Sequence, residues 1–218
     1  MALSGPARKA RIISAVPSLP PLAAEILDFW FVPREGERLA KPPAADGGVT
    51  RSVWFDKNDA FDDEIRRRFG APLAAGIAGA FGDWCTSPRG CLARVVLLDQ
   101  FTRNAYRGTP DAFAGDDRAL ATSEDAIERG FDGELRVHER WFLYLPFEHS
   151  ESLAVQERGV ALFDALARDT GFTDPLPYPA RHRDIIRRFG RFPHRTEILG
   201  RASTPEEIAF LKEPGSRF

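Results

Sequence analysis

Apolar residues recur along most of this chain at the three- and four-residue spacing of an amphipathic helix. In the segment 21–31, for example, Pro21 stands at a first-turn position, and Ile26, Phe29 and Trp30 share one broad face. No convincing run of alternating apolar and polar residues predicts a strand. The pattern therefore predicts an all-α fold of about eight or nine helices.

Capping residues and prolines set the expected limits of these helices. Asn58 or Asp59 can cap one helix, and Ser150 can cap another. Pro146 is expected to end the helix that precedes Ser150. The helix over 88–104 is apolar all round in its middle, which predicts a buried central position. Residues 32–52 are expected to form a loop, and the expected helices cover 21–31, 59–70, 72–81, 88–104, 116–129, 134–144, 151–168, 179–189 and 205–212.

Length and composition suit one domain with a sizeable core. The 218 residues are 43% hydrophobic and 28% charged, which is ordinary for a globular protein. We expect residues 1–19 to form a flexible arm and residues 20–218 to form a single helical domain. The formal net charge of −2 gives no general attraction to nucleic acid or to a membrane. No apolar run predicts a membrane span or a signal peptide.

Two cysteines, Cys85 and Cys91, are present. Two thiols make no disulfide framework, and a zinc site would need a third or fourth ligand. We therefore expect a reduced protein in the cytoplasm, with no metal and no cofactor. The basic stretch near the C-terminus is short and is interrupted by Phe residues, so a nucleic-acid partner is not expected either.

Polar groups fall within apolar helix faces in four segments, and the first contains Asp99, Arg103 and Arg107. These three residues are spaced four apart and share a helix face, and Asn104 follows Arg103 directly. The face continues an apolar line, which places Asp99 partly in the core, where it needs a partner such as Arg103. The pattern fits either a structural salt bridge or a carboxylate that orients an Arg or His in a pocket.

The second segment joins two expected helices at Glu148 and His149, and Gln156 follows one to two turns later. Near a helix start, backbone N–H groups point outward and can meet an anion. A histidine beside a carboxylate can act as an acid or a base, so His149 is a candidate catalytic residue that Glu148 would orient. The alternative is a hydrogen-bonded knot between the two helices.

The third and fourth segments lie close together near the C-terminus, where Arg and His alternate with Phe, Ile and Leu. A surface helix would separate these two kinds of residue on opposite faces. His182 is either a core histidine or an acid–base group. Arg191, His194 and Arg195 form either an anion cradle or a turn that bonds to helix-end carbonyls. His138 lies among charged neighbours and is expected to be exposed.

Several longer motifs resemble a large, mainly bacterial family known as domain of unknown function nine-two-four. They are DFWF (28–31), LLDQFTRNAYRGTPDAF (97–113), FLYLPFEHSE (142–151) and FGRFPHR (189–195), and the resemblance extends over nearly the whole chain from about residue 22. It implies a fold similar to the tetratricopeptide-like helical superfamily, with antiparallel helix pairs in a curved layer. The sequence itself shows no repeat of about 34 residues. The resemblance implies no established activity.

Two functional hypotheses and one structural hypothesis follow. In the first, a small phosphate- or carboxylate-bearing anion binds in a pocket lined by Arg and His, with acid–base catalysis as a further step. In the second, stacked helix pairs hold a peptide or protein in a groove, which predicts exposed apolar, Asn or Arg groups and no buried His cluster. In the third, the polar motifs only fix core packing. The candidate acid–base and orienting groups are His149, His194, His182, Glu148 and Asp99, and the candidate ligand-binding groups are Arg103, Asn104, Arg107, Gln156, Arg191 and Arg195.

Overall fold

The computed structural model describes residues 18–41 and 48–216, and helices dominate both ranges. Within these residues the only β-pairing is an isolated bridge between Leu39 and Arg51. The all-α prediction is therefore confirmed. Most of the predicted N-terminal arm, 1–19, lies outside the described residues. No helix in the described part of the chain is long and apolar enough to cross a membrane.

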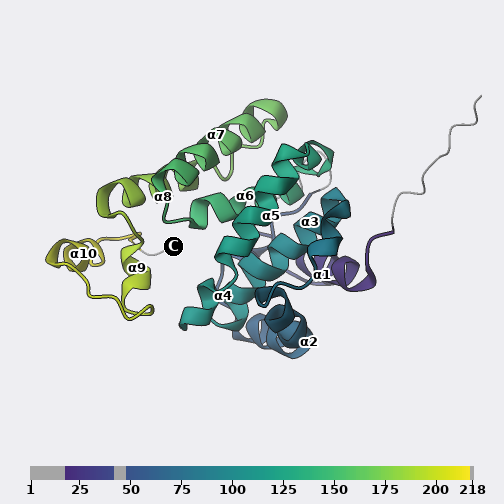
Figure 1. Cartoon of the computed structure of the whole chain (residues 1–218), viewed down its shortest axis with the longest axis horizontal. Coiled ribbons are helices and arrows are strands. Elements are labelled where there is room, and N and C mark those ends of the chain that lie inside the picture. Colours follow the sequence, from purple (N-terminus) through teal and green to yellow (C-terminus); the bar gives the residue numbers. More distant parts are fainter. Residues whose placement is uncertain (1–17, 42–47, 217–218) are drawn as a thin grey trace, which may run out of the picture.

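The helices form one larger body and a C-terminal arm. Figure 1 shows α1 to α6 packed together. α7 packs along α6, and α8 packs against α7 and leads to α9 and α10 on the left. The elements are α1 (Pro21–Phe31), η1 (Ser52–Trp54), α2 (Asp59–Ile77), η2 (Gly82–Thr86), α3 (Pro88–Val95), η3 (Val96–Phe101), α4 (Thr102–Ala105), η4 (Pro110–Phe113), α5 (Asp116–Glu128), η5 (Phe131–Glu134), α6 (Val137–His149), α7 (Leu153–Thr170), α8 (Pro177–Phe189), α9 (Pro193–Thr196) and α10 (Pro205–Phe210).

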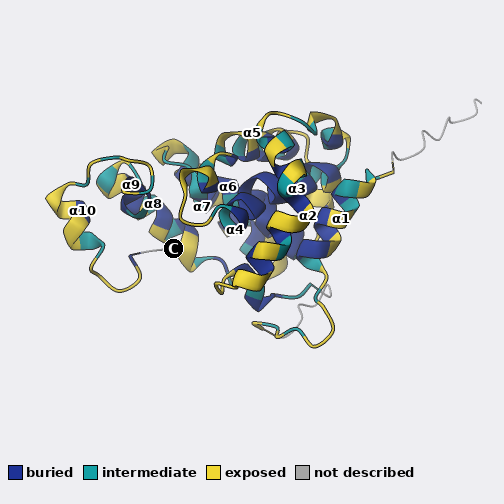
Figure 2. Cartoon of the chain, turned by 90° about the horizontal axis from the view of Figure 1, so that it is seen from below, coloured by how far each residue is buried: buried dark blue, intermediate teal, exposed yellow. Residues whose placement is uncertain are grey.

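The main core is built from aromatic rings on four different elements. The Trp30 ring of α1 lies 5.7 Å from that of Phe101 in η3 and 5.5 Å from that of Phe142 in α6, and Phe69 of α2 lies 4.9 Å from Phe101. The apolar side chains of α3 and η3 from Cys91 to Phe101 are fully buried, which confirms the predicted central position (Figure 2). A second, smaller cluster in the C-terminal arm contains Ile185, Ile186 and Phe192.

The central helix changes its winding halfway along. The sequence predicted one α-helix over 88–104, but α3 passes into a π-helical turn, η3, and then into the short α4. A π turn contains one more residue than an α turn and redirects the side chains that follow it. The Thr102 hydroxyl donates to the Leu98 carbonyl at 2.8 Å, and a Cβ added to Gly115 would lie 2.1 Å from the same carbonyl oxygen. The absence of a side chain at Gly115 therefore allows α5 to begin directly against the π turn.

Two helices continue through prolines beside which the sequence pattern predicts a helix boundary. α2 includes Pro72 and is one helix rather than two, and α6 includes Pro146 and reaches its end three residues later. Proline removes one helical hydrogen bond and crowds the preceding turn, which disfavours a helix interior. Here buried side chains on both sides of the proline, such as Phe69 and Leu73 in α2, keep the helix continuous through their packing.

The continuation of α6 changes the neighbouring boundaries. His149 is the last residue of α6 instead of lying at the start of the next helix. The predicted cap at Ser150 is also wrong, because α7 begins at Leu153 with Ser152 in the N-cap position. Since three residues, Ser150, Glu151 and Ser152, separate α6 from α7, the His149 side chain projects from a helix C-terminus and not from an anion-binding helix start.

His138 was expected to be exposed and is buried. Its Nε2 lies 3.0 Å from the Thr50 hydroxyl, and its ring centroid lies 4.9 Å from that of Phe172. The first turn of α6 therefore faces the chain before η1 instead of solvent. The charged neighbours of His138 gave no indication of this contact, because adjacent residues on a helix point in different directions.

A buried arginine fastens the loop between α1 and α2. Nη1 of the fully buried Arg51 donates to the carbonyl oxygens of Phe29 and Trp30, both at 2.6 Å. Nε and Nη2 of the same residue donate to the Glu37 carboxylate, also at 2.6 Å each. The last carbonyls of a helix lack intrahelical partners, so Arg51 caps α1 from a position about twenty residues further along the chain.

Replacement of this buried arginine is expected to be costly. We expect Arg51→Met to lower the free energy of unfolding by about 3–5 kcal/mol, because the Glu37 carboxylate and two helix-end carbonyls lose their donor. Arg38→Met is the matched control, since Arg38 makes a largely exposed ion pair with Asp56 at 2.9 Å. We expect the control to change stability by less than about 1 kcal/mol. Urea unfolding of both variants compares them, and equal effects would contradict the capping role.

Candidate functional site

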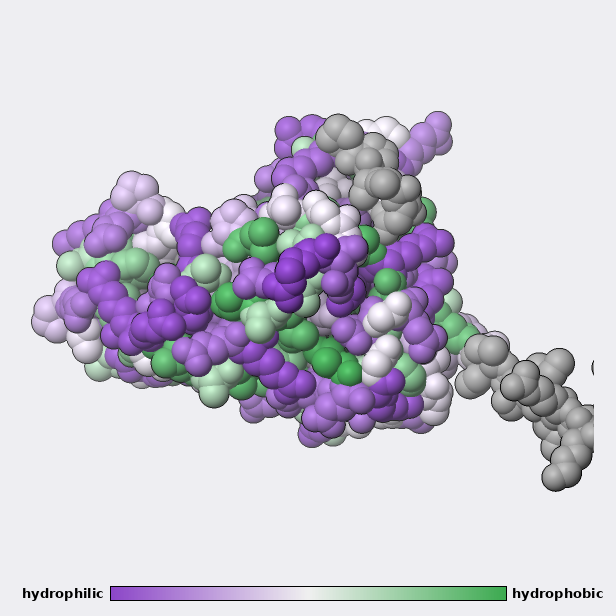
Figure 3. Space-filling model, turned by 90° about the horizontal axis from the view of Figure 1, so that it is seen from above, coloured by the Kyte–Doolittle hydropathy of each residue, from purple (hydrophilic) through white to green (hydrophobic). Residues whose placement is uncertain are grey.

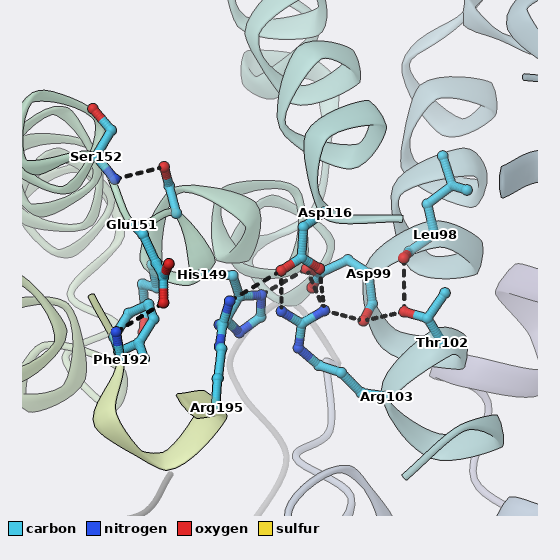
Figure 4. Close-up of polar contacts among 12 residues, drawn as sticks. Leu98, Asp99, Thr102, Arg103, Asp116, His149, Glu151, Ser152, Phe192 and Arg195 are labelled. Atoms are coloured by element: carbon cyan, nitrogen blue, oxygen red, sulfur yellow. Dashed lines mark hydrogen bonds and ion pairs between the residues drawn. The ribbon is translucent and has the colours of Figure 1, made fainter. Parts of the chain in front are cut away.

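The candidate site is built around Asp99, a fully buried carboxylate on the π turn. Oδ1 of Asp99 lies 2.6 Å from His149 Nδ1 and 3.1 Å from Arg103 Nη1 (Figure 4). Oδ2 accepts a 2.6 Å hydrogen bond from Gln100 Nε2. Burial favours the neutral acid, but Arg103 and the hydrogen bond with His149 outweigh burial and hold the pKa of Asp99 at about 2. The carboxylate is therefore ionised at neutral pH.

Asp116, the first residue of α5, joins two arginines from distant parts of the chain. Nη1 and Nη2 of Arg103 donate to its two carboxylate oxygens at 2.7 and 3.0 Å. Nη1 of Arg195, on α9, lies 3.3 Å from Oδ2 of Asp116 (Figure 4). Arg103 also donates to the backbone carbonyl of Asp99 at 2.8 Å. These contacts connect η3, α4, α5 and α9 in one network.

The geometry around His149 assigns the state of its ring. An ionised Asp99 can only accept a hydrogen bond, so Nδ1 carries the hydrogen and the lone pair of the neutral ring lies on Nε2. Burial, followed by the charge of Arg103, lowers the pKa of His149 below its usual 6.5, although Asp99 acts in the opposite direction. His149 is therefore a neutral base at pH 7.

Glu148 and His182 lie next to the pair formed by Asp99 and His149. His182 Nδ1 donates to the Tyr178 carbonyl at 2.9 Å and lies 3.4 Å from Glu148 Oε2. Burial lowers the pKa of His182 to about 3. Burial, together with the charge of Asp99, raises the pKa of Glu148 well above its ordinary value. Both side chains therefore favour their neutral forms, and neither adds charge to the site near pH 7.

Gln156 of α7 holds the connection between α6 and α7. Its Nε2 donates to the backbone carbonyls of Glu148 and Ser150 at 2.6 and 2.7 Å. Because Gln156 is almost completely buried, it fixes the chain that follows His149 without facing solvent. Gln156 therefore orients the end of α6.

Glu151 anchors the segment that carries Arg195. Its Oε1 accepts a 2.8 Å hydrogen bond from the Phe192 backbone N–H, and Arg201 donates to both of its oxygens at 2.7 and 3.0 Å. His194 lies in the same segment, with its ring centroid 5.5 Å from that of Phe192. Burial, followed by the charge of Arg195, lowers the pKa of His194 to about 4. The histidine is therefore neutral at pH 7.

Asn104 and Arg107 do not join this network. Asn104 Nδ2 and Arg107 Nε donate to the Asp62 carboxylate of α2 at 2.7 and 2.8 Å. The four-residue spacing predicted that Arg107 shares the face of Arg103. That placement is wrong, because α4 ends at Ala105 and the chain then turns away from the helix axis.

Arg191, His194 and Arg195 do not form one cradle. Arg191 donates to both carboxylate oxygens of Glu207 in α10, at 2.6 and 2.8 Å. α9 begins only at Pro193, so Arg191 and Arg195 do not lie on a common helix face. Arg191 therefore fastens α10, and Arg195 alone turns toward Asp116.

A cleft of about 400 Å³ opens beside the network. His149, Asp116 and Arg195 line it, together with apolar side chains such as Phe113 and Leu120. This volume is that of a pocket for a small molecule. No set of three or more His, Cys, Asp or Glu side chains within residues 18–41 and 48–216 is grouped to hold a metal ion. The cleft lining itself offers one imidazole, that of His149, and charged side chains.

Arg195 is the cationic group of this cleft. Its guanidinium carbon lies 4.6 Å from the Phe113 ring centroid and 4.4 Å from that of Phe192, so the two rings enclose it. Burial, followed by repulsion from Arg103, lowers the pKa of Arg195 to about 10, and the group stays charged at pH 7. Its single ion pair with Asp116 is 3.3 Å long, and its buried Nε has no hydrogen-bond partner among the described residues. Arg195 is therefore an incompletely bonded cation.

The sequence did not reveal Asp116, Glu151 or Phe113 as members of the site. Asp116 and Glu151 matched the ordinary preference for acidic residues in the first turn of a helix. Their partners, Arg103 and Arg201, lie 13 and 50 residues away along the chain. No local spacing predicts such pairs. Each buried arginine needs an acid to compensate its charge. Which acid does so can be identified only once the fold is known.

Comparisons with known proteins agree on a family and supply no activity. Residues 26–215 match the family described as bacterial protein of unknown function (DUF924). A solved structure of a protein of unknown function from Agrobacterium tumefaciens is 39% identical, with a TM-score of 0.74. That match covers 88% of this chain and 97% of the other. No curated protein matches the chain.

The opposite pKa shifts of two neighbouring acids predict opposite effects of the same substitution. The pKa of Glu148 is higher in the folded than in the unfolded protein, so the folded state favours the neutral acid. The stability that this side chain contributes is therefore present below the pKa of the unfolded state and is lost as the pH rises above it. Gln mimics the neutral acid at every pH. We therefore expect Glu148→Gln to gain stability relative to the natural protein between pH 5 and pH 8, by at most about 1.4 kcal/mol per pH unit.

Glu151→Gln is the matched comparison. Hydrogen bonds from Arg201 and the Phe192 N–H outweigh burial and lower the pKa of Glu151, so its contribution is present above the unfolded pKa and is lost as the pH falls. We expect Glu151→Gln to be less stable than the natural protein at pH 8, by about 1 kcal/mol, and to approach it near pH 4. Urea unfolding across this range measures both trends. Parallel pH profiles for the two variants would show that Glu148 is not a neutral acid.

Proposed function

Because the chain belongs to the DUF924 family of bacterial proteins of unknown function, no relative supplies a reaction, and we propose a function from the site itself. We propose that the cleft binds a small phosphate- or carboxylate-bearing anion and that His149 exchanges a proton with it. The observation that carries this proposal is the 2.6 Å hydrogen bond between Asp99 and His149, on a histidine that lines the cleft.

His149 has the properties of a general base. Asp99 fixes the orientation and the tautomer of the ring, and its charge stabilises the imidazolium that forms when Nε2 takes a proton. Arg103 opposes that charge and keeps the ring neutral at pH 7 in the absence of ligand. A bound molecule with an acidic proton within hydrogen-bond reach of Nε2 would transfer it there. The proposed chemistry is therefore proton transfer.

Arg195 supports the anion part of the proposal. A buried guanidinium is stabilised by each charge-assisted hydrogen bond that it gains, and Arg195 makes only one within the described part of the chain. Of its other donors, Nε is enclosed by the protein, and Nη2 can meet an oxygen of a carboxylate or phosphate in the cleft. Asn104, Arg107 and Arg191 have acidic partners outside this network and are not part of the proposed binding site.

Peptide binding in a helical groove is the alternative function. It predicted an exposed apolar surface and no buried cluster of histidines. On the face shown in Figure 3, green apolar areas are interrupted by purple polar side chains. The mostly buried His149, His182 and His194, with pKa values below the usual one, support the small-molecule proposal instead. The likeness to tetratricopeptide-like helical layers stays a prediction.

We also propose that the protein works in the cytoplasm without a metal or cofactor. Cys85 and Cys91 are both free thiols, which supports a reducing compartment. The overall charge of −2 supports neither a nucleic-acid nor a membrane partner.

Anion binding is tested by ligand-dependent stabilisation. We expect acetate or inorganic phosphate at saturating concentration to raise Tm above the value in chloride of equal ionic strength. A ligand at 100 times its Kd adds about 2.7 kcal/mol of stability, or roughly 5–10 °C for a chain of this size. We expect Arg195→Met to lose this increment and Arg191→Met to keep it, because Arg191 is bound to Glu207.

Either substitution can change the Tm of the ligand-free protein. The rise in Tm that the anion causes is therefore compared within each variant, because that rise reports binding and not folding. Retention of the full increment by Arg195→Met would remove Arg195 from the site. The absence of any increment with either anion in the natural protein would overturn the anion-binding proposal.

A further inference from the structure

The charges around the cleft restrict the ligand that it can hold. The groups that line the cleft, or that contact a lining residue, are four carboxylates and three guanidinium groups, so their net charge is −1. The neutral histidines and Glu148 do not change this balance near pH 7. The seven groups are Asp99, Asp116, Asp117, Glu151, Arg103, Arg195 and Arg201.

This balance disfavours a doubly charged ligand. Asp116 and Glu151 already take most of the positive charge of Arg103 and Arg201. Arg195 is left as one cation with unused donors, and Asp117 lies exposed on the same cleft. A monoanion compensates Arg195, whereas a phosphate dianion adds a second negative charge close to Asp116 and Asp117.

The shape of the Arg195 site also favours a carboxylate. The Phe113 and Phe192 rings both pack against the Arg195 guanidinium, which restricts the directions from which a partner can approach it. A carboxylate is small and planar, so one of its oxygens can reach Nη2 in the plane of the guanidinium. A tetrahedral phosphate presents further oxygens that need donors outside the guanidinium plane. Beyond Arg195 and His149, the lining offers one further side-chain donor, the Ser150 hydroxyl, and its carboxylates Asp116 and Asp117 accept and do not donate.

Apolar side chains form much of the remaining lining. Phe113 and Leu120 lie on the α5 side of the cleft, Pro146 comes from α6, and Leu199 follows α9. Leu199 is 37% exposed although it is a large apolar residue. Burial of such side chains against an apolar ligand body is favourable in proportion to the area removed from water. The lining therefore suits a molecule with one charged end and an apolar remainder.

We infer that the ligand of the cleft is a monocarboxylate with an apolar body, held by Arg195 at its carboxylate and by Phe113, Leu120, Pro146 and Leu199 along its body. This inference rests on the proposed anion site and deepens it by naming the ligand class. Simple aliphatic acids are the probes of choice, because their length changes the apolar area and leaves the charge constant.

Calorimetric titration at pH 7 compares four probes: acetate, hexanoate, hexanol and inorganic phosphate. Each methylene group that becomes buried tightens binding by about fourfold. Hexanoate is expected to bind at least about tenfold more tightly than acetate, since partial burial of its chain suffices for that ratio. Hexanol lacks the charge, and phosphate lacks the apolar body and carries excess charge. Both are expected to bind at least about tenfold more weakly than hexanoate.

Two exposed branched aliphatic residues, Leu199 and Ile208, allow a matched pair of variants. Leu199→Ser removes part of the apolar wall, and Ile208→Ser makes a similar change on α10, outside the cleft lining. Both side chains are exposed, at 37% and 48%, so neither substitution removes core packing. Leu199→Ser is expected to weaken hexanoate binding by about threefold or more and to leave acetate unchanged. Ile208→Ser is expected to change neither.

The outcomes separate this inference from the proposal on which it rests. Phosphate binding as tight as hexanoate binding, and dependent on Arg195, would overturn the monocarboxylate class and leave the anion site standing. Equal binding of hexanol and hexanoate would show that the charge contributes nothing, and binding of none of the anions would refute the site itself. An equal loss of hexanoate affinity in Leu199→Ser and Ile208→Ser would show that Leu199 does not contact the apolar body of the ligand.

Discussion

Much of the site follows from one constraint, the burial of the Asp99 carboxylate. An ionised acid without access to water needs donors and opposite charge, because an uncompensated buried charge costs several kcal/mol. Arg103, Gln100 and His149 meet this need, and they come from α4, the π turn and the end of α6. Arg103 then requires further negative charge, which Asp116 supplies. The compensation of a single charge thus brings distant segments of the chain together.

The same successive compensation of charges determines the chemistry that the cleft offers. Asp116 is shared between Arg103 and Arg195, so Arg195 remains a cation with unused donors. His149 receives opposing influences from Asp99 and Arg103 and stays neutral with a basic Nε2. A nearly balanced set of charges therefore still leaves one base and one anion-binding group on the same cleft. This combination, rather than an excess of positive charge, is the basis of the proposed function.

The sequence predicted the local parts of this arrangement and missed the long-range ones. Helical periodicity gave the all-α fold, the buried central helix and the pairing of Asp99 with Arg103, because these depend on neighbours within one or two turns. The contact between Asp99 and His149 spans 50 residues, and no local rule predicts it. Arg107 was misplaced because a helix end cannot be located to within one turn from spacing alone. The helix ends predicted at Gly70 and before Pro146 are wrong because tertiary packing, which local propensity does not include, keeps α2 and α6 continuous.

The protonation state of His149 is the most direct test of this account. Nitrogen-15 NMR of the histidine rings, with His149 assigned by its loss in His149→Gln, reports which ring nitrogen carries hydrogen at each pH. We expect a neutral ring at pH 7 with hydrogen on Nδ1 and none on Nε2, and a midpoint for protonation below the usual 6.5. A ring with hydrogen on Nε2 alone, or one already charged at pH 7, would contradict the assignment of His149 as a base oriented by Asp99.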